Sequence, residues 1–250
     1  MQFSIFVLPI VLPVIFWTCY HLYKDRHLPE PPSHLLFAFL LGAAASFLAL
    51  FLYRALGWFD LRYDAFVLAE TNLPGLFSYA VLAIGMIEEI SKMVPFLLVV
   101  LYFREFNEPI DGIIYGSYIA LGFAAVENIQ YVQWEPAMQA IGRGFAGPVV
   151  HMVFASIWGY HIGRAHLCGR PLGRVILGSL AVTAVLHGIY DFVVIALPDW
   201  LALAALLIAG GWIWRLALIR DLHALPPGPC PKDAVPCRGE AAVEGPTGDE

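Results

Sequence analysis

Seven ionisable side chains lie inside stretches of the sequence that are otherwise apolar. They are Glu88, Glu89, Lys92, Glu127, His151, His187 and Asp191. In a bilayer each such charge costs roughly 3 kcal/mol, so these residues face a bundle interior or a water-filled cavity. Carboxylates and imidazoles gathered in such a place can activate water by taking up its proton. The pattern therefore indicates a hydrolytic centre inside a membrane.

Two carboxylates and one ammonium share a single turn of the segment GMIEEISKMVPF. Because helix neighbours stand three and four positions apart, Lys92 can reach either Glu88 or Glu89. One cation cannot neutralise both carboxylates, which leaves one of them to act as a general acid or base. A buried ion pair that only fixes helix packing is the alternative interpretation.

The other polar positions follow on three later segments. His187 and Asp191 are four residues apart in AVLHGIYDFVV, so they face the same way, and Asp191 can orient His187 or join it as a metal ligand. An unpaired Glu127 would be costly in lipid, which favours a functional role. Asn128 equally suits an interhelical hydrogen bond. A single histidine in a helix is usually a structural core residue, and His151 is a candidate site residue only because the other polar residues occur with it.

The composition defines the class of protein that must position these groups. Of 250 residues 60% are hydrophobic and only 14% are charged, against about 25% charged residues in soluble domains. We predict an all-α, polytopic transmembrane bundle over residues 1–220, with a disordered cytoplasmic tail rich in Pro and Gly at 221–250. No basic patch suggests binding of nucleic acid. About seven spans are expected, at roughly 3–21, 34–56, 76–103, 110–133, 146–163, 174–197 and 199–219.

The basic residues predict the orientation of the bundle. With the N-terminus outside, ten of the fourteen basic residues fall on the cytoplasmic side, three fall outside, and Lys92 lies within a span. This inside-positive bias predicts an N-out, C-in arrangement. The polar positions are then reached from the outer leaflet and can line one cavity open to the extracytoplasmic side. The ten are Lys24, Arg26, Arg104, Arg164, Arg170, Arg174, Arg215, Arg220, Lys232 and Arg238; the three are Arg54, Arg62 and Arg143.

Residues 85–192 form a motif core that resembles the PrsW-type intramembrane proteases, relatives of the CAAX prenyl endoproteases. The resemblance rests on IEEISK, on EPIDGIIYGSYIALGFAAVENIQY, on His151 in GPVVHMVFASIWGY, and on LHGIYDF, in this order on successive spans. It does not extend to the first two spans, the seventh span or the tail. It implies a bacterial plasma-membrane protease that makes a first cut in membrane-anchored regulators, such as anti-sigma factors, near the extracytoplasmic side.

In the prenyl-protease relatives a glutamate of the double-Glu motif activates water, helped by a histidine, and a later histidine and asparagine bind the oxyanion. This chain has Glu127 where the relatives have His, and Asp191 where they have Asn. The resemblance thus implies that Glu88 or Glu89 is the base, held by Lys92. His151 or His187 would stabilise the oxyanion or shuttle the proton, and Glu127 would be a second acid or an anchor.

We expect catalysis without a cofactor on a single-span membrane protein within the lipid bilayer. Zinc is the alternative, with Glu127, His151, His187 and Asp191 as candidate ligands. Two other functions use similar residues: a metal-dependent membrane hydrolase of the ceramidase type, and a proton-coupled transporter. The polar residues occur once, without a second copy in another half of the chain, which counts against transport.

Overall fold

A computed structural model describes residues 2–24, 29–132 and 137–224 of the chain. All regular structure within these ranges is helical, and they contain no β-strand. A backbone in lipid must satisfy its own hydrogen bonds, and a helix does so within one segment. The predicted all-α fold is therefore confirmed for the described residues.

Within the described ranges, five helices are long and apolar enough to cross a membrane, namely α2, α6, α7, α8 and α9. The predicted spans at 3–21 and 76–103 are helical too, as α1 and as the consecutive α4, η1 and α5, so the number seven stays a prediction. The elements are α1 (Gln2–Lys24), α2 (Pro32–Gly57), α3 (Ala65–Thr71), α4 (Leu73–Tyr79), the π-helix η1 (Ala80–Gly85), α5 (Met86–Tyr102), α6 (Pro109–Tyr131), α7 (Ala137–Leu167), α8 (Leu172–Ala196), the 3₁₀ turn η2 (Pro198–Trp200) and α9 (Leu201–His223).

Two segments differ from the sequence-based expectation. The stretch after α2 was expected to be a loop, but it contains α3, because the side chain of Asp64 caps that helix by accepting from the backbone of Phe66 and Val67. At the other end α9 continues to His223, beyond the expected start of the tail at 221. The rest of the predicted disordered tail, 225–250, lies outside the described residues.

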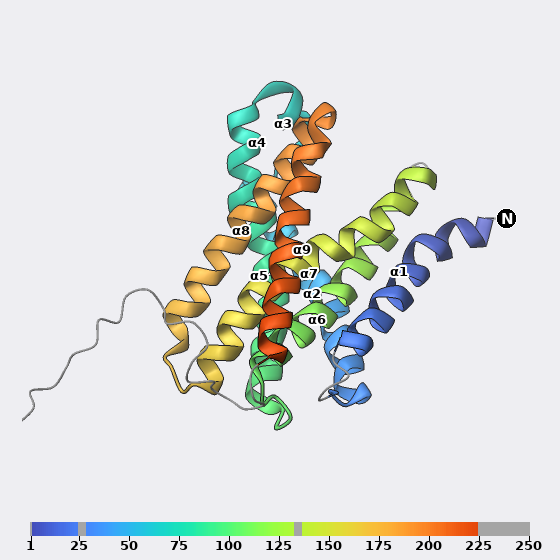
Figure 1. Ribbon diagram of the computed structural model, residues 1–250. Helices are drawn as coiled ribbons and strands as arrows, with labels where there is room; N and C mark the ends of the chain where they lie inside the picture. The colour runs from blue at the N-terminus through green and yellow to red at the C-terminus, as the bar shows by residue number, and fades with distance from the viewer. Residues whose placement is uncertain (1, 25–28, 133–136, 225–250) are drawn as a thin grey trace, which may run out of the picture.

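Helix α6 forms the centre of the bundle. Of its most apolar 18-residue stretch, 94% of the residues are buried. The corresponding share in α9 is 17%, so α9 lies at the periphery. Glycines at positions 112, 116 and 122 of α6 let the backbones of α7 and α2 approach closely, as small residues do between membrane helices. In Figure 1 α8 lies on one side of the view and α1 on the other, and α9 runs in front between them.

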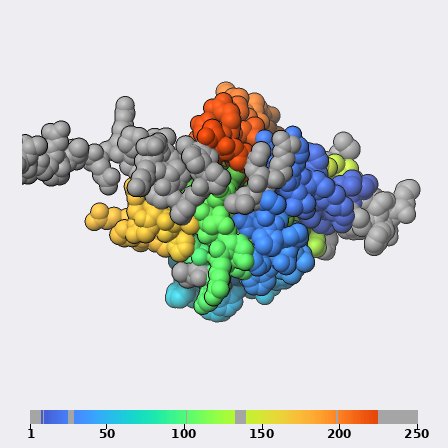
Figure 2. Space-filling view, turned by 60° about the horizontal axis from the view of Figure 1, so that its bottom comes forward, coloured from blue at the N-terminus to red at the C-terminus, as the bar shows by residue number. Residues whose placement is uncertain are grey.

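The connections gather at two ends of the bundle. In Figure 1 the lower end holds the end of α1, the α5–α6 and α7–α8 connections and the end of α9, and the upper end holds α3 and the α8–α9 turn. Figure 2 brings the lower end forward, where the blue, green, yellow and orange-red segments meet. The loops predicted to be cytoplasmic therefore share one end of the molecule.

Arg215 differs from the other basic residues counted for orientation. It is fully buried inside the bundle, where it donates to Ser156 and Ser117 and lies 2.9 Å from the ring of His21. These partners belong to α7, α6 and α1, so Arg215 ties the peripheral helices to the centre. Arg215 is therefore a packing residue and does not count as a loop charge.

Candidate active site

The seven ionisable residues found in the sequence converge at one place. They come from α5, α6, α7 and α8, and an unbroken series of contacts of at most 3.6 Å joins all seven. Lys92 Nζ lies 2.6 Å from Glu89 Oε1 and 3.0 Å from His151 Nδ1. The other ring nitrogen of His151 lies 2.7 Å from Glu127 Oε2. His187 Nδ1 lies 2.8 Å from Glu89 Oε1, while its Nε2 lies 3.6 Å from Asp191 Oδ2.

Two glycines allow α8 to approach the start of α5. A Cβ on Gly85 would lie 2.3 Å from the carbonyl oxygen of Ala184, and a Cβ on Gly188 would lie 2.5 Å from Val81 Cα. Real Cβ atoms are not found that close to backbone atoms, so only glycine fits at either position. Because Gly188 follows His187 directly, this contact sets how close His187 comes to the two glutamates.

Glu89 is completely surrounded. Its side chain is 0% exposed and accepts from three donors: Lys92, His187 Nδ1 and, at 2.9 Å, the indole nitrogen of Trp158. Three hydrogen bonds, one of them from the Lys92 ammonium, satisfy the buried charge, as a carboxylate in low dielectric requires. Glu89 is thus arranged to hold Lys92 and His187 in place.

Glu88 has different surroundings, although it is the next residue. Its Oε1 accepts from the hydroxyl of Tyr53 at 3.1 Å, whereas its Oε2 is buried without a hydrogen-bond partner among the described residues. That oxygen lies 3.6 Å from His187 Nε2 and 4.0 Å from His151 Nδ1. Glu88 is therefore the glutamate of the pair with a free oxygen toward the histidines.

The hydrogen bonds assign the proton on each histidine. An ammonium can only donate, so His151 Nδ1 must accept from Lys92, and its Nε2–H donates to Glu127. A carboxylate accepts, so His187 Nδ1–H donates to Glu89 and turns Nε2 toward Glu88. Glu89 is the closer orienting carboxylate of His187, at 2.8 Å against 3.6 Å for Asp191.

Asp191 Oδ2 is a second buried oxygen without a hydrogen-bond partner among the described residues. It and Glu88 Oε2 each lie 3.6 Å from His187 Nε2, slightly beyond direct hydrogen bonding. Separations of this kind suit a bridging water or a small polar group of a substrate. The arrangement can therefore hold a water molecule and take up its proton.

Two of the cavities formed by the described residues reach these side chains. The larger, of about 550 Å³, is lined by Glu88, Glu127, Arg143, His151, His187 and Asp191 together with apolar side chains. The smaller, of about 290 Å³, also contains Glu88 and Glu127 and is otherwise lined mainly by α2, η1, α6 and the residues around Tyr63. Helix α6 rises from the lower end of the bundle in Figure 1, and Glu127 lies four residues, or about 6 Å along the axis, before its last residue. The site is therefore nearer the upper end of the bundle.

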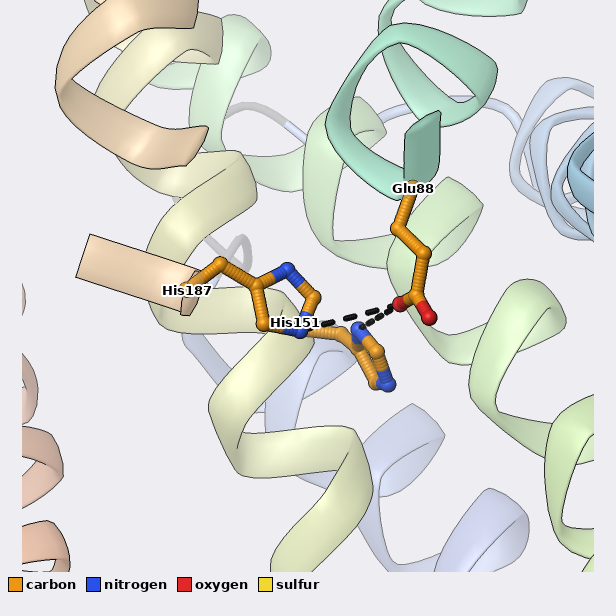
Figure 3. A group of neighbouring side chains, drawn as sticks. All are labelled: Glu88, His151 and His187. Atoms are coloured by element: carbon orange, nitrogen blue, oxygen red, sulfur yellow. Dashed lines mark ion pairs between the residues drawn. The ribbon is translucent and has the colours of Figure 1, made fainter. Parts of the chain in front are cut away.

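Glu88, His151 and His187 also form a geometric group that could hold a metal ion, since one ligand atom from each lies within 4.8 Å of the others. Figure 3 shows the three side chains, from α5, α7 and α8, pointing toward one another, with dashed lines from Glu88 to both histidines. This group contains Glu88, whereas the ligand set suggested from the sequence contained Glu127 and Asp191. Glu127 is engaged by Arg143 at 2.7 Å and by His151.

The structure adds three residues that the sequence analysis did not single out. Tyr53 and Trp158 bond to the two glutamates, and Arg143 binds Glu127 while its guanidinium lies 3.6 Å from the ring centre of Tyr131. Aromatic residues in apolar spans carry no signal of such a role. Arg143 had been counted only as an outer loop charge. Asn128 is buried beside Gly147 of α7, as a residue at a helix contact would be.

Comparison with known proteins decides the family. The sequence pattern of the PrsW family intramembrane metalloproteases matches residues 30–216. The chain belongs to the PrsW family. The match begins before the second predicted span and includes most of the seventh, so the similarity extends beyond the motif core expected from the sequence.

Other proteins of the PrsW family resemble the chain over most of its length. A protein named Protease PrsW from Clostridioides difficile (strain 630) is 29% identical over 87% of this chain and 90% of its own. Another of that name from Bacillus subtilis (strain 168) is 30% identical over 76% of this chain and 83% of its own. No solved structure matches significantly. The chain is therefore a membrane-embedded protease and a multi-pass protein of the bacterial cell membrane.

The family description includes a metal, and the residues present fit one. Two imidazoles and a carboxylate are the donor set of many zinc hydrolases. Glu88 offers a buried oxygen without a partner among the described residues, and Glu89 fixes the ring of His187 as outer carboxylates commonly do at metal sites. One feature opposes the fit, because Lys92 occupies the lone pair of His151 Nδ1.

Proposed function

We propose that this chain hydrolyses a peptide bond of a single-span membrane protein, such as an anti-sigma factor, near the extracytoplasmic face, with water activated at Glu88. The observation that carries the proposal is the contrast within the glutamate pair. Glu89 is saturated by three donors, whereas Glu88 directs an oxygen without a partner among the described residues toward His187 and a large cavity.

In the proposed reaction Glu88 Oε2 takes a proton from water, and the water oxygen bonds to the carbonyl carbon of the scissile peptide. In its imidazolium form, His187 donates Nδ1–H to Glu89 and Nε2–H to the tetrahedral oxyanion, which this second hydrogen bond stabilises. The C–N bond then breaks, and the proton returns from Glu88 to the leaving amine. The products are a carboxylic acid and an amine, with water as the only co-reactant.

The other residues hold this arrangement. Glu89 fixes the ring of His187 through Nδ1–H, and Lys92 joins Glu89 to His151. Glu127 lines the cavity and accepts from His151 and Arg143, so it acts as a hydrogen-bond anchor. Asp191 contributes a second carboxylate oxygen close to His187 Nε2.

A divalent metal, if the working enzyme uses one, would be held by Glu88, His151 and His187, and would activate water and polarise the scissile carbonyl as a Lewis acid. Lys92 would then have to give up its hydrogen bond to His151 Nδ1.

The orientation is part of the proposal. The lower end of the bundle carries Lys24 at the end of α1, Arg104 and Arg170 in the connections, and Arg174 at the start of α8, which supports a cytoplasmic lower end. The α8–α9 turn and α3 then face outward, and the site opens toward the extracytoplasmic half. A first cut at that depth suits a substrate whose folded domain lies outside the cell.

The experiment that tests the proposal compares membrane and secreted proteomes of cells with wild type, Glu88→Gln and the control Glu70→Gln. Glu70 is an exposed residue of α3, so its variant matches the chemical change at a neutral site. A single-span protein should accumulate uncut with Glu88→Gln and be processed with the other two. The proposal fails if no single-span protein differs between wild type and Glu88→Gln at equal expression.

A second measurement decides on the metal. Wild type, His187→Ala and Asp191→Asn are purified in detergent and analysed for metal content as well as cleavage. Without a metal, none of the three contains a stoichiometric ion, and Asp191→Asn keeps partial activity because the amide still forms hydrogen bonds. Stoichiometric zinc in wild type that is lost in His187→Ala would establish the metal-dependent form of the site.

A further inference from the structure

A third cavity lies beside the candidate active site, on the flank of the bundle. It has a volume of about 460 Å³ and is lined almost entirely by apolar side chains of α1, α7, α8 and α9. We call it the lateral groove. It shares five lining residues with the larger active-site cavity, which are Ala146, Val150, Tyr190, Val194 and Leu201.

The α9 wall of the groove is a single helix face of six residues, three of which are alanines. Its members stand at spacings of three and four: Leu201, Ala204, Ala205, Ile208, Ala209 and Trp212. They cover eleven residue steps, or about 16 Å along the axis, which is half the thickness of the hydrocarbon core. The alanines leave room between α9 and the helices behind it, and Ala205 and Ala209 remain exposed. Trp17 and Trp212 stand edge to face with ring centres 5.2 Å apart and line the same groove.

We propose that this groove receives the apolar transmembrane segment of the substrate and guides its outer end to Glu88. The inference rests on the proposed function. A peptide bond near the membrane can reach a buried carboxylate only together with the apolar residues beside it. A groove without charged side chains suits that segment, and the shared residues connect it to the ionisable cluster. Small residues let two helices approach closely in lipid, where van der Waals packing drives association.

The place where the lateral groove joins the active-site cavity also predicts how a substrate helix is oriented in the groove. Leu201 lies at the upper end of α9, next to the α8–α9 turn, and lines both spaces, whereas Trp212 lies eleven residues lower and lines the groove alone. A substrate helix lying along α9 would thus have its outer end at the active-site cavity and its middle beside Ala205 and Ala209.

The test uses variants whose larger side chain fills the groove, and a control variant with the same substitution elsewhere on α9. Ala205→Trp and Ala209→Trp place an indole in the groove, whereas Ala202→Trp adds it to an exposed alanine of α9 that does not line the groove. The substrate is the single-span protein that accumulates in the proteomic comparison. Cleavage should fall at least tenfold in the first two variants and stay within twofold of wild type in the third, with apparent melting temperatures within a few degrees of one another.

A second measurement does not depend on activity. A photoreactive amino acid replaces Ala205, Ala209 or Ala202 in the Glu88→Gln background, and the same substrate is captured by irradiation. Crosslinks at 205 and 209 but not at 202 support the groove as the docking site. Crosslinks only to lipid or to a second copy of this chain, or normal cleavage by both groove variants, would overturn it. Failure of wild type to cleave any single-span protein would instead overturn the proposed function on which the groove rests.

Discussion

Glu88 and Glu89 are adjacent in the sequence, yet their surroundings assign them different tasks. Successive positions of a helix point about 100° apart, so one glutamate turns toward Trp158 and Lys92 and the other toward Tyr53 and the cavity. Glu89 is the residue that neutralises the buried Lys92. This division predicts different consequences for the same substitution at the two positions.

Glu89→Gln should unfold more readily than Glu88→Gln. The substitution at Glu89 leaves Lys92 buried without its counter-charge, and removing one partner of a buried ion pair costs about 3–5 kcal/mol. The Glu88→Gln variant keeps a carbonyl oxygen for Tyr53 and should melt near wild type. Thermal unfolding of the purified variants in detergent gives the comparison. Equal melting temperatures would mean that the ion pair with Lys92 does not hold the site together.

At the scale of elements, the contact of α8 with η1 places His187 against the glutamates. A Cβ on Gly188 would lie 2.5 Å from Val81 Cα, whereas at Gly178, also in α8, it would meet nothing within 4 Å. The two glycines thus provide a matched pair on one helix.

Gly188→Ala should lower stability by about 1–3 kcal/mol through overpacking and should reduce cleavage strongly, because α8 must shift and carry His187 with it. Gly178→Ala should be neutral or slightly stabilising, since alanine is favoured over glycine in a helix by about 1 kcal/mol. Melting temperature and cleavage rate are measured for both variants. Equal behaviour of the two would show that the α8–η1 contact does not position the histidine.

The elements were only partly predictable from the sequence. The spacing of Glu88 with Lys92 and of His187 with Asp191 predicted which faces meet, because those intervals follow the helix period. It could not predict which glutamate is saturated, since Trp158 and His187 are far away in the sequence and only tertiary packing brings them to Glu89. The π-helical turn η1 was missed because a uniformly apolar run does not distinguish helix types, and α3 was missed because its seven residues are too few to show a span-length apolar pattern.

At the scale of the whole molecule, the proposed N-out, C-in orientation rests on the charges at the two ends of the bundle. A reporter fused after Glu250 should be active only in its cytoplasmic form, and one inserted at the exposed Asp60 only in its external form. Both fusions are assayed with a pair of reporters that are active on opposite sides of the membrane. The reverse pattern would direct the candidate site toward the cytoplasm and rule out a first cut from outside.

The most direct test of the account measures cleavage by the purified protein in vesicles, with the single-span substrate from the proteomic comparison in the same membrane. Wild type and Glu70→Gln should cut it at one position near the outer end of its transmembrane segment. Glu88→Gln should cut it at least about 100-fold more slowly, since an amide cannot take up the proton of water, and should melt at the wild-type temperature. A Glu88→Gln rate within twofold of wild type would contradict water activation at Glu88, the central claim.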